Sequence, residues 1–157
     1  MSQKGSVLIV TSDTLLGSLL QRALQAQGYE TALCRSAAAA LAQLATLVPT
    51  VLVVDLALSD DTGWGLLRQA RARGLLAPRV DEQGNTCLPV VLLSFNPLQS
   101  RCRGELRPLA CLPRICPLGA VLRLVAHACA QWSSETAQAP VAASETGLPT
   151  GEDWRYA

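Results

Sequence analysis

The polar residues that could do chemistry in this sequence stand at the carboxyl ends of short apolar runs. They are Thr11, Ser12 and Asp13, then Asp55, then Ser94, and finally the segment Arg114-Ile115-Cys116-Pro117. Asp55 directly follows the run Val51–Val54. A carboxylate at the end of a buried strand is costly unless it is solvated, paired or bound to a metal. Asp55 could therefore ligate a cation, and the plainer alternative is a loop acid that caps a helix.

The elements that must position these residues follow from the hydrophobic pattern. Continuous apolar runs of strand length predict buried strands, whereas leucines and alanines at spacings of three and four predict helices. Strands are predicted at 7–10, 29–35, 51–54, 89–94 and 109–112, and helices after residue 13, at 36–47, 63–73 and 117–132. We read 75–87 as an extended loop because it holds Pro78, Gly84 and a polar run, and 96–107 as a short, irregular helix.

Strands that alternate with helices predict βαβ units, a central parallel sheet and helices on both of its faces. In such α/β folds, ligands bind beyond the carboxyl ends of the strands. Because the polar residues named above all follow strands, we expect them to meet at this one edge of the sheet.

The order and spacing of these segments resemble a response-regulator receiver domain. Asp55 and Gly63 stand where that family has its phosphorylated aspartate and a glycine eight residues later, and Ser94 stands at its conserved Thr/Ser. Cys116-Pro117 occupies the place of its Lys-Pro pair. The resemblance implies a flavodoxin-like (βα)5 fold, a three-layer sandwich around a five-stranded parallel sheet of order 2-1-3-4-5. It covers residues 4–132.

The sequence departs from the family at the positions that carry its chemistry. Two acids after the first strand bind Mg²⁺ in the family, and here they are Thr11 and Ser12. Asp13 is one residue too late and is predicted to cap the following helix, so a metal would have only Asp13 and Asp55. The family's lysine is Cys116. Phosphoryl transfer depends on neutralising charge on the phosphoryl oxygens, so these losses should slow it by orders of magnitude. The same losses remove close like charges from Asp55, which is expected to be an ordinary ionised carboxylate held by Ser or Thr hydroxyls.

These departures lead to a first hypothesis of a pseudo-receiver, a non-enzymatic signalling module that acts by protein–protein contact and needs no cofactor. The alternative is a single-domain response regulator that a histidine kinase phosphorylates on Asp55 with Mg²⁺. A third class, an enzyme or nucleotide binder on a similar sheet, lacks support because neither GxGxxG nor GxxxxGK[ST] occurs. Pairing of two copies through their last helices stays open.

Composition limits the remaining classes. The 157 residues fit one domain at 1–132 and a tail at 133–157, which is poor in apolar residues and predicted to be disordered. A net charge of +1 gives no electrostatic field that would attract nucleic acid, and no apolar run suggests a membrane span.

The absence of a signal peptide predicts a cytoplasmic protein with reduced cysteines. Trp154 and Tyr156 stand in the tail, and we leave open whether they form a docking peptide or a solvated spacer.

Overall fold

A computed structural model describes residues 5–80, 83–94 and 107–145, with side chains described as far as residue 132. Its strands are β1 (Ser6–Val10), β2 (Glu30–Cys34), β3 (Val51–Asp55), β4 (Arg79–Val80), β5 (Thr86–Ser94) and β6 (Pro108–Pro113). Its helices are α1 (Thr14–Ala26), α2 (Ala37–Leu44), α3 (Gly63–Ala72) and α5 (Leu118–Glu145). No helix within these ranges is long and apolar enough to cross a membrane.

The sheet has the parallel core that the sequence predicts. β1 pairs in parallel with β2 on one side and β3 on the other, β3 pairs with β5, and β5 pairs with β6. The five parallel strands therefore stand in the order β2-β1-β3-β5-β6, which confirms the predicted 2-1-3-4-5 when the parallel strands are numbered along the chain. Their carboxyl ends all reach one edge of the sheet.

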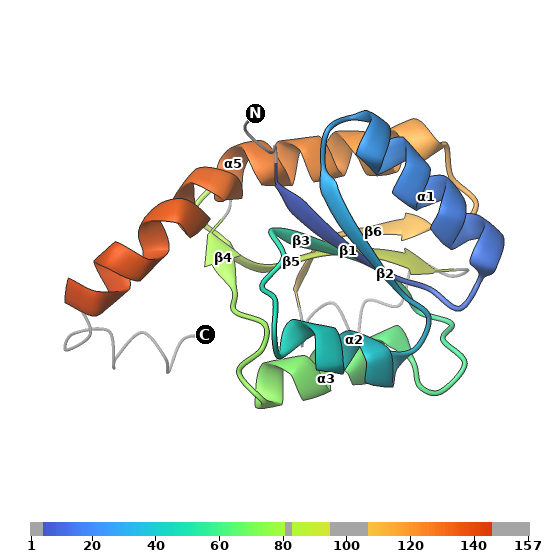
Figure 1. The fold of residues 1–157 in the computed structure, drawn as a ribbon, viewed down its shortest axis with the longest axis horizontal. Coiled ribbons are helices and arrows are strands. Elements are labelled where there is room, and N and C mark those ends of the chain that lie inside the picture. The colour runs from blue at the N-terminus through green and yellow to red at the C-terminus, as the bar shows by residue number, and fades with distance from the viewer. Residues whose placement is uncertain (1–4, 81–82, 95–106, 146–157) are drawn as a thin grey trace.

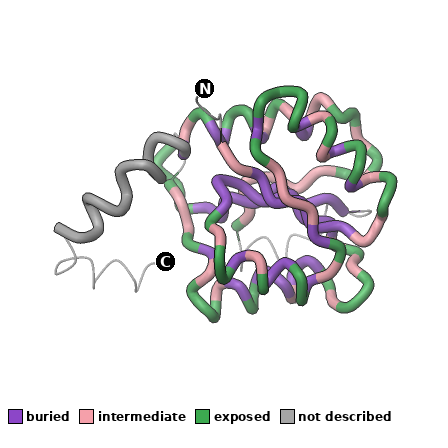
Figure 2. Tube along the Cα trace, viewed as in Figure 1, coloured by how far each residue is buried: buried purple, intermediate pink, exposed green. Residues whose placement is uncertain are grey.

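Helices cover both faces of the sheet and form two cores (Figure 1). On one face, α2 and α3 bury leucines and alanines against residues such as Leu8 and Leu52. On the other face, α1 and α5 pack against their neighbours in the same strands, including Val7 and Val53. Because successive strand residues point to opposite faces, the fully apolar runs supply both cores, and Figure 2 shows the central strands as the most continuously buried part of the chain.

The prediction of a plain loop at 75–87 is wrong in part. Arg79 and Val80 form β4, which pairs antiparallel with Cys87 and Thr86 at the start of β5. Gly84 has φ +84°, a left-handed conformation that glycine adopts readily in turns. The segment is therefore not wholly irregular, because β4 and the start of β5 pair as an antiparallel hairpin.

The hairpin is attached to the last helix through one carbonyl. Trp132 Nε1 donates to Val80 O at 3.1 Å, and Gln131 Nε2 donates to the same oxygen at 3.2 Å.

The helix that carries these donors extends past its predicted end at residue 132 and reaches Glu145, so the first part of the predicted tail is helical. The domain boundary at 132 stays a prediction. The predicted helix at 96–107 and residues 146–157 lie outside the described residues.

Candidate functional site

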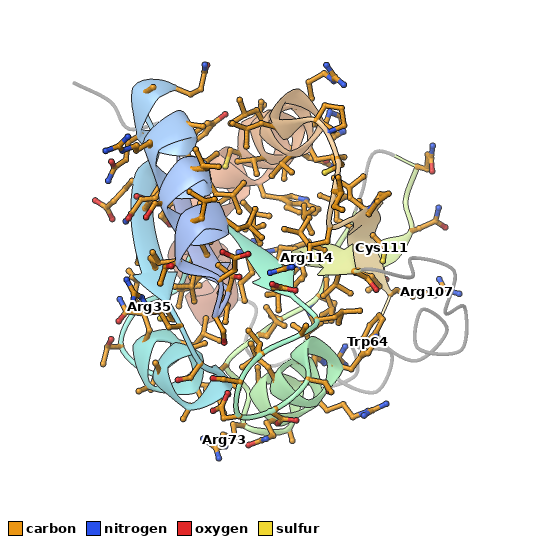
Figure 3. The ribbon with its side chains drawn as sticks, turned by 90° about the vertical axis from the view of Figure 1, so that its right-hand side faces the viewer. Arg35, Trp64, Arg73, Arg107, Cys111 and Arg114 are labelled. Carbon is orange, nitrogen blue, oxygen red and sulfur yellow. The ribbon has the colours of Figure 1, made fainter. Side chains whose placement is uncertain are left out.

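The carboxyl edge of the sheet brings together most of the polar residues that the sequence predicts there, and Figure 3 looks onto it. Asp55 is the last residue of β3 and is only 1% exposed. The start of α3 lies close behind it, since a Cβ on Gly63 would come within 3.1 Å of the Asp55 carbonyl oxygen and within 3.0 Å of Leu56 Cα. Glycine at position 63 therefore lets the helix pack directly onto the strand that ends in Asp55.

Three donors hold the buried carboxylate. Thr11 Oγ1 donates to Asp55 Oδ2 at 2.9 Å, and the backbone N–H of Ala57 donates to Oδ1 at 3.1 Å. The third donor is Arg114 Nε, 3.0 Å from Oδ2. The expectation that a hydroxyl holds Asp55 is thus confirmed for Thr11. Each carboxylate oxygen accepts at least one hydrogen bond, as a buried charge requires.

Arg114 joins two carboxylates that lie 42 residues apart in the chain. Its Nε contacts Asp55 Oδ2 at 3.0 Å and its Nη2 contacts Asp13 Oδ2 at 2.9 Å. The backbone N–H of Arg114 also donates to Ser94 O at 2.8 Å, which fixes the residue at the end of β6. One guanidinium therefore occupies the space between the two acids, and Figure 3 shows it near the centre of this edge. The segment that begins with Arg114 was expected at this edge, but no role was predicted for Arg114 itself.

Asp13 and Ser12 have separate partners. Asp13 caps α1, because its Oδ1 accepts from the backbone N–H of Leu15 and of Leu16 at 3.0 and 3.1 Å, as predicted. Ser12 does not bind Asp55 in any contact of the described residues. Its hydroxyl donates to Arg35 O at 2.7 Å and accepts from Ser59 N at 2.9 Å. Of the two positions that are acidic in the resembled family, only Thr11 thus contacts the central carboxylate.

Neither Ser94 nor Cys116 adds charge to the site. Ser94 is buried at the end of β5, and its carbonyl receives the Arg114 N–H. Cys116 packs at the margin of the core formed by α1 and α5. Burial raises the pKa of its thiol, so the thiol is protonated near neutral pH and supplies no cation. Cys34, Cys87, Cys111, Cys116 and Cys129 form no disulfide in the described part of the chain, and Cys102 lies outside the described residues.

The arrangement favours a closed ionic contact over a metal centre. Mg²⁺ needs several oxygen ligands in near-octahedral geometry, and here the charges of both nearby acids face a guanidinium. Within the described ranges, no group of three or more His, Cys, Asp or Glu side chains could hold a metal ion. The residues present therefore do not fit Mg²⁺ while Arg114 keeps its position.

The charge of Asp13 should make part of the stability dependent on pH. Hydrogen bonds from Leu16 N–H and Leu15 N–H and the nearby Arg114 guanidinium hold the pKa of its carboxyl below the ordinary value. A lowered folded-state pKa means stability that is present above about pH 4 and lost as the pH falls through the folded-state pKa.

Asp13→Asn keeps a good helix cap but removes this charge. We expect the wild-type protein to be the more stable of the two at pH 7, and the difference in unfolding free energy to shrink between pH 5 and pH 3. Urea unfolding at several pH values measures this difference. A difference that is unchanged at pH 3 would show that the carboxylate charge contributes nothing.

Comparison with known proteins identifies the fold. No protein-family model matches the sequence. A receiver domain protein from Methanospirillum hungatei superposes with a TM-score of 0.69 at 19% identity, over 85% of this chain and 99% of that one. Chemotaxis response regulator CheY4 of Vibrio cholerae gives 0.66 at 16%, over 81% and 99%. The chain therefore has the fold of response-regulator receiver domains.

One curated protein is similar in sequence over a shorter stretch. The acid tolerance regulatory protein ActR of Rhizobium meliloti is 37% identical over 68 residues, which is 43% of this chain. The matched stretch spans about a third of that protein's length, 35%.

Proposed function

We propose that this chain is a pseudo-receiver, a signalling module of the two-component type that acts by protein–protein contact and catalyses no reaction. The observation that carries the proposal is the Arg114 guanidinium between Asp55 and Asp13, with Asp55 only 1% exposed. An internal cation neutralises the acid at the phosphoacceptor position, so that no metal is needed to balance its charge. We place the protein in the cytoplasm, where such modules meet their partners.

The site lacks the acid and the lysine on which phosphoryl transfer depends in the resembled family, and this supports the proposal. A phosphoryl group on Asp55 would add negative charge beside Asp13, while Thr11 and Cys116 are neutral where the resembled family has an acid and a lysine. A charged hydrogen bond contributes roughly 1.5–3 kcal/mol, and each 1.4 kcal/mol changes a rate about tenfold. Loss of the metal and of the lysine should together slow phosphorylation by several orders of magnitude.

Exposed apolar side chains beside the ion pair support contact with a protein partner. Ile115 is 88% exposed and Leu15 is 69% exposed, and they stand next to Arg114 and two residues after Asp13. Because the Arg114 side chain and its N–H both face the site, its neighbour Ile115 is presented to solvent. Large apolar side chains exposed next to both members of the ion pair would suit contact with a protein partner.

The second candidate function is a response regulator that a histidine kinase phosphorylates on Asp55. Asp55 and Ser94 occupy the expected positions, and Arg114 could turn towards an added phosphoryl group, because its side chain is 20% exposed. This candidate requires Arg114 to leave Asp55 before the reaction, and requires Mg²⁺ to bind with few carboxylates.

Beryllofluoride with Mg²⁺ separates the two candidates. The full chain at millimolar beryllofluoride, or incubated with acetyl phosphate, is expected to show no adduct by ¹⁹F NMR and by intact mass, while an active receiver domain treated in parallel becomes fully modified. A stoichiometric adduct that disappears in Asp55→Ala would overturn the pseudo-receiver proposal and establish the second candidate. Arg114→Lys is an informative companion variant, because it keeps the cation but shortens its hydrogen-bonding reach.

A further inference from the structure

A groove between α2 and α3 is a hollow that the Asp55 site does not use. Its volume is about 540 Å³, within the roughly 300–1,000 Å³ of typical ligand sites. On the α2 side it is lined by Ala38, Ala42 and Ala45, which are exposed. Three methyl groups in a row leave the space between the helices open, where larger side chains would fill it.

The α3 side of the groove carries opposite charges at its two ends. Asp61 precedes the helix and Arg73 follows it, and both line the groove. Gln69 connects them, because its Nε2 donates to Asp61 Oδ2 at 3.2 Å and its Oε1 accepts from Arg73 Nη2 at 3.4 Å. An occupant that suits this groove is apolar in the middle, acidic at the Arg73 end and basic at the Asp61 end.

The segment 150–157 of the same chain has this pattern in this order. It reads Thr-Gly-Glu-Asp-Trp-Arg-Tyr-Ala, with its two acids before Trp154 and its one base after it. In an extended chain, alternate side chains share a face, so Trp154 and Tyr156 would both point towards the alanines. Aromatic side chains bury about 150–250 Å² each, which is ample to cover three methyl groups.

The course of the chain indicates that the segment 150–157 would enter the groove at the Arg73 end. Trp132 on α5 contacts Val80, and Val80 is only seven residues from Arg73, at most about 25 Å along the chain. Beyond Trp132, α5 projects past the sheet and slopes towards the side that holds α2 and α3 (Figure 1). From Glu145, where α5 ends, nine residues lead to Trp154 and can span about 30 Å. A chain that arrives from this side meets Arg73 first and Asp61 last.

We propose that residues 150–157 dock in the α2–α3 groove, with Trp154 and Tyr156 against the alanines of the α2 side. On the opposite face of the extended segment, Asp153 lies beside Arg73 and Arg155 lies towards Asp61. The docked segment shields the groove from other proteins and ties the far end of α5 to the opposite layer of the fold. This contact is independent of the chemistry at Asp55.

Backbone amide NMR on the full chain tests the docking. Truncation after residue 149 is expected to shift the amide signals of Ala38, Ala42 and Ala45, and Trp154→Ala with Tyr156→Ala should reproduce those shifts. Thr150→Ala, which keeps both aromatic residues, should leave the signals in place. Groove amides that do not move on truncation would overturn the proposal.

A variant that fills the groove provides the second test. Ala42→Leu should displace the segment and shift the tail amides, whereas Ala26→Leu, an exposed alanine on α1, should not. A synthetic peptide of residues 150–157, added to the truncated chain, should restore the groove signals only at about millimolar concentration, because a linked segment acts at a high effective concentration. Shifts in the full chain that grow with protein concentration would instead mean that the segment docks on a second copy, and would overturn docking within one chain.

Discussion

Arg114→Ala is expected to lower the free energy of unfolding by about 3 kcal/mol, the lower end of the range for breaking a buried ion pair. The change leaves Asp55 buried with a charge that, among the described residues, the Thr11 hydroxyl and the Ala57 N–H still contact. The partial exposure of the arginine, 20% of its side chain, argues against a larger value. Urea unfolding followed by circular dichroism measures the loss.

Two further variants make this result specific to the ion pair. Arg123→Ala removes an exposed arginine from α5 and should change the unfolding free energy by less than about 0.5 kcal/mol. Asp55→Asn combined with Arg114→Ala should cost less than the two single changes together, by about 0.5–3 kcal/mol. If Arg114→Ala proves as mild as Arg123→Ala, the guanidinium does not stabilise Asp55.

Trp132→Ala should destabilise the protein by about 3–5 kcal/mol, as expected for the loss of a large core side chain. Trp132 is fully buried among residues of α1, α5 and the sheet, and its Nε1 supplies one of the two hydrogen bonds to Val80 O. Circular dichroism is the suitable probe for the unfolding, because the change removes a fluorophore. Hydrogen exchange should show faster opening of the β4–β5 hairpin.

The conservative variants separate packing from hydrogen bonding at this position. Trp132→Phe keeps much of the apolar volume, and Gln131→Ala removes only the second donor to Val80 O, at a cost of about 0.5–1.5 kcal/mol. Hydrogen exchange of the hairpin that is the same in Trp132→Ala as in the wild type would show that the helix does not hold it.

The parallel sheet and the edge where Asp55 lies could be predicted because the signals are local. Runs such as Val51–Val54 are apolar at every position, which is expected for strands covered on both faces. The carboxyl ends of parallel strands must share an edge, so Thr11, Asp55 and Ser94 could be placed together before any coordinates were known. The cap made by Asp13 was equally accessible, because it depends on residues two and three positions away.

The contacts made by Arg114 were missed because they depend on the reach of a long side chain across 59 and 101 residues. A signal was nonetheless present. A buried acid without metal ligands or a lysine requires another cation, and Arg114 is the basic residue directly after the last strand. The hairpin was missed for a different reason: two-residue strands have no periodicity, and Gly84 and Pro78 are as common in loops as in turns.

Helix α5 has one consequence for motion. The start of α5 follows the loop in which Arg114 is hydrogen-bonded at the carboxyl edge of the sheet. Trp132, near the middle of α5, is hydrogen-bonded to the hairpin at the opposite edge. Fifteen residues of helix between these points form a rod of roughly 20 Å. Because a helix of this length is stiff, a displacement of the Ile115 loop along the helix axis is expected to move β4 as well.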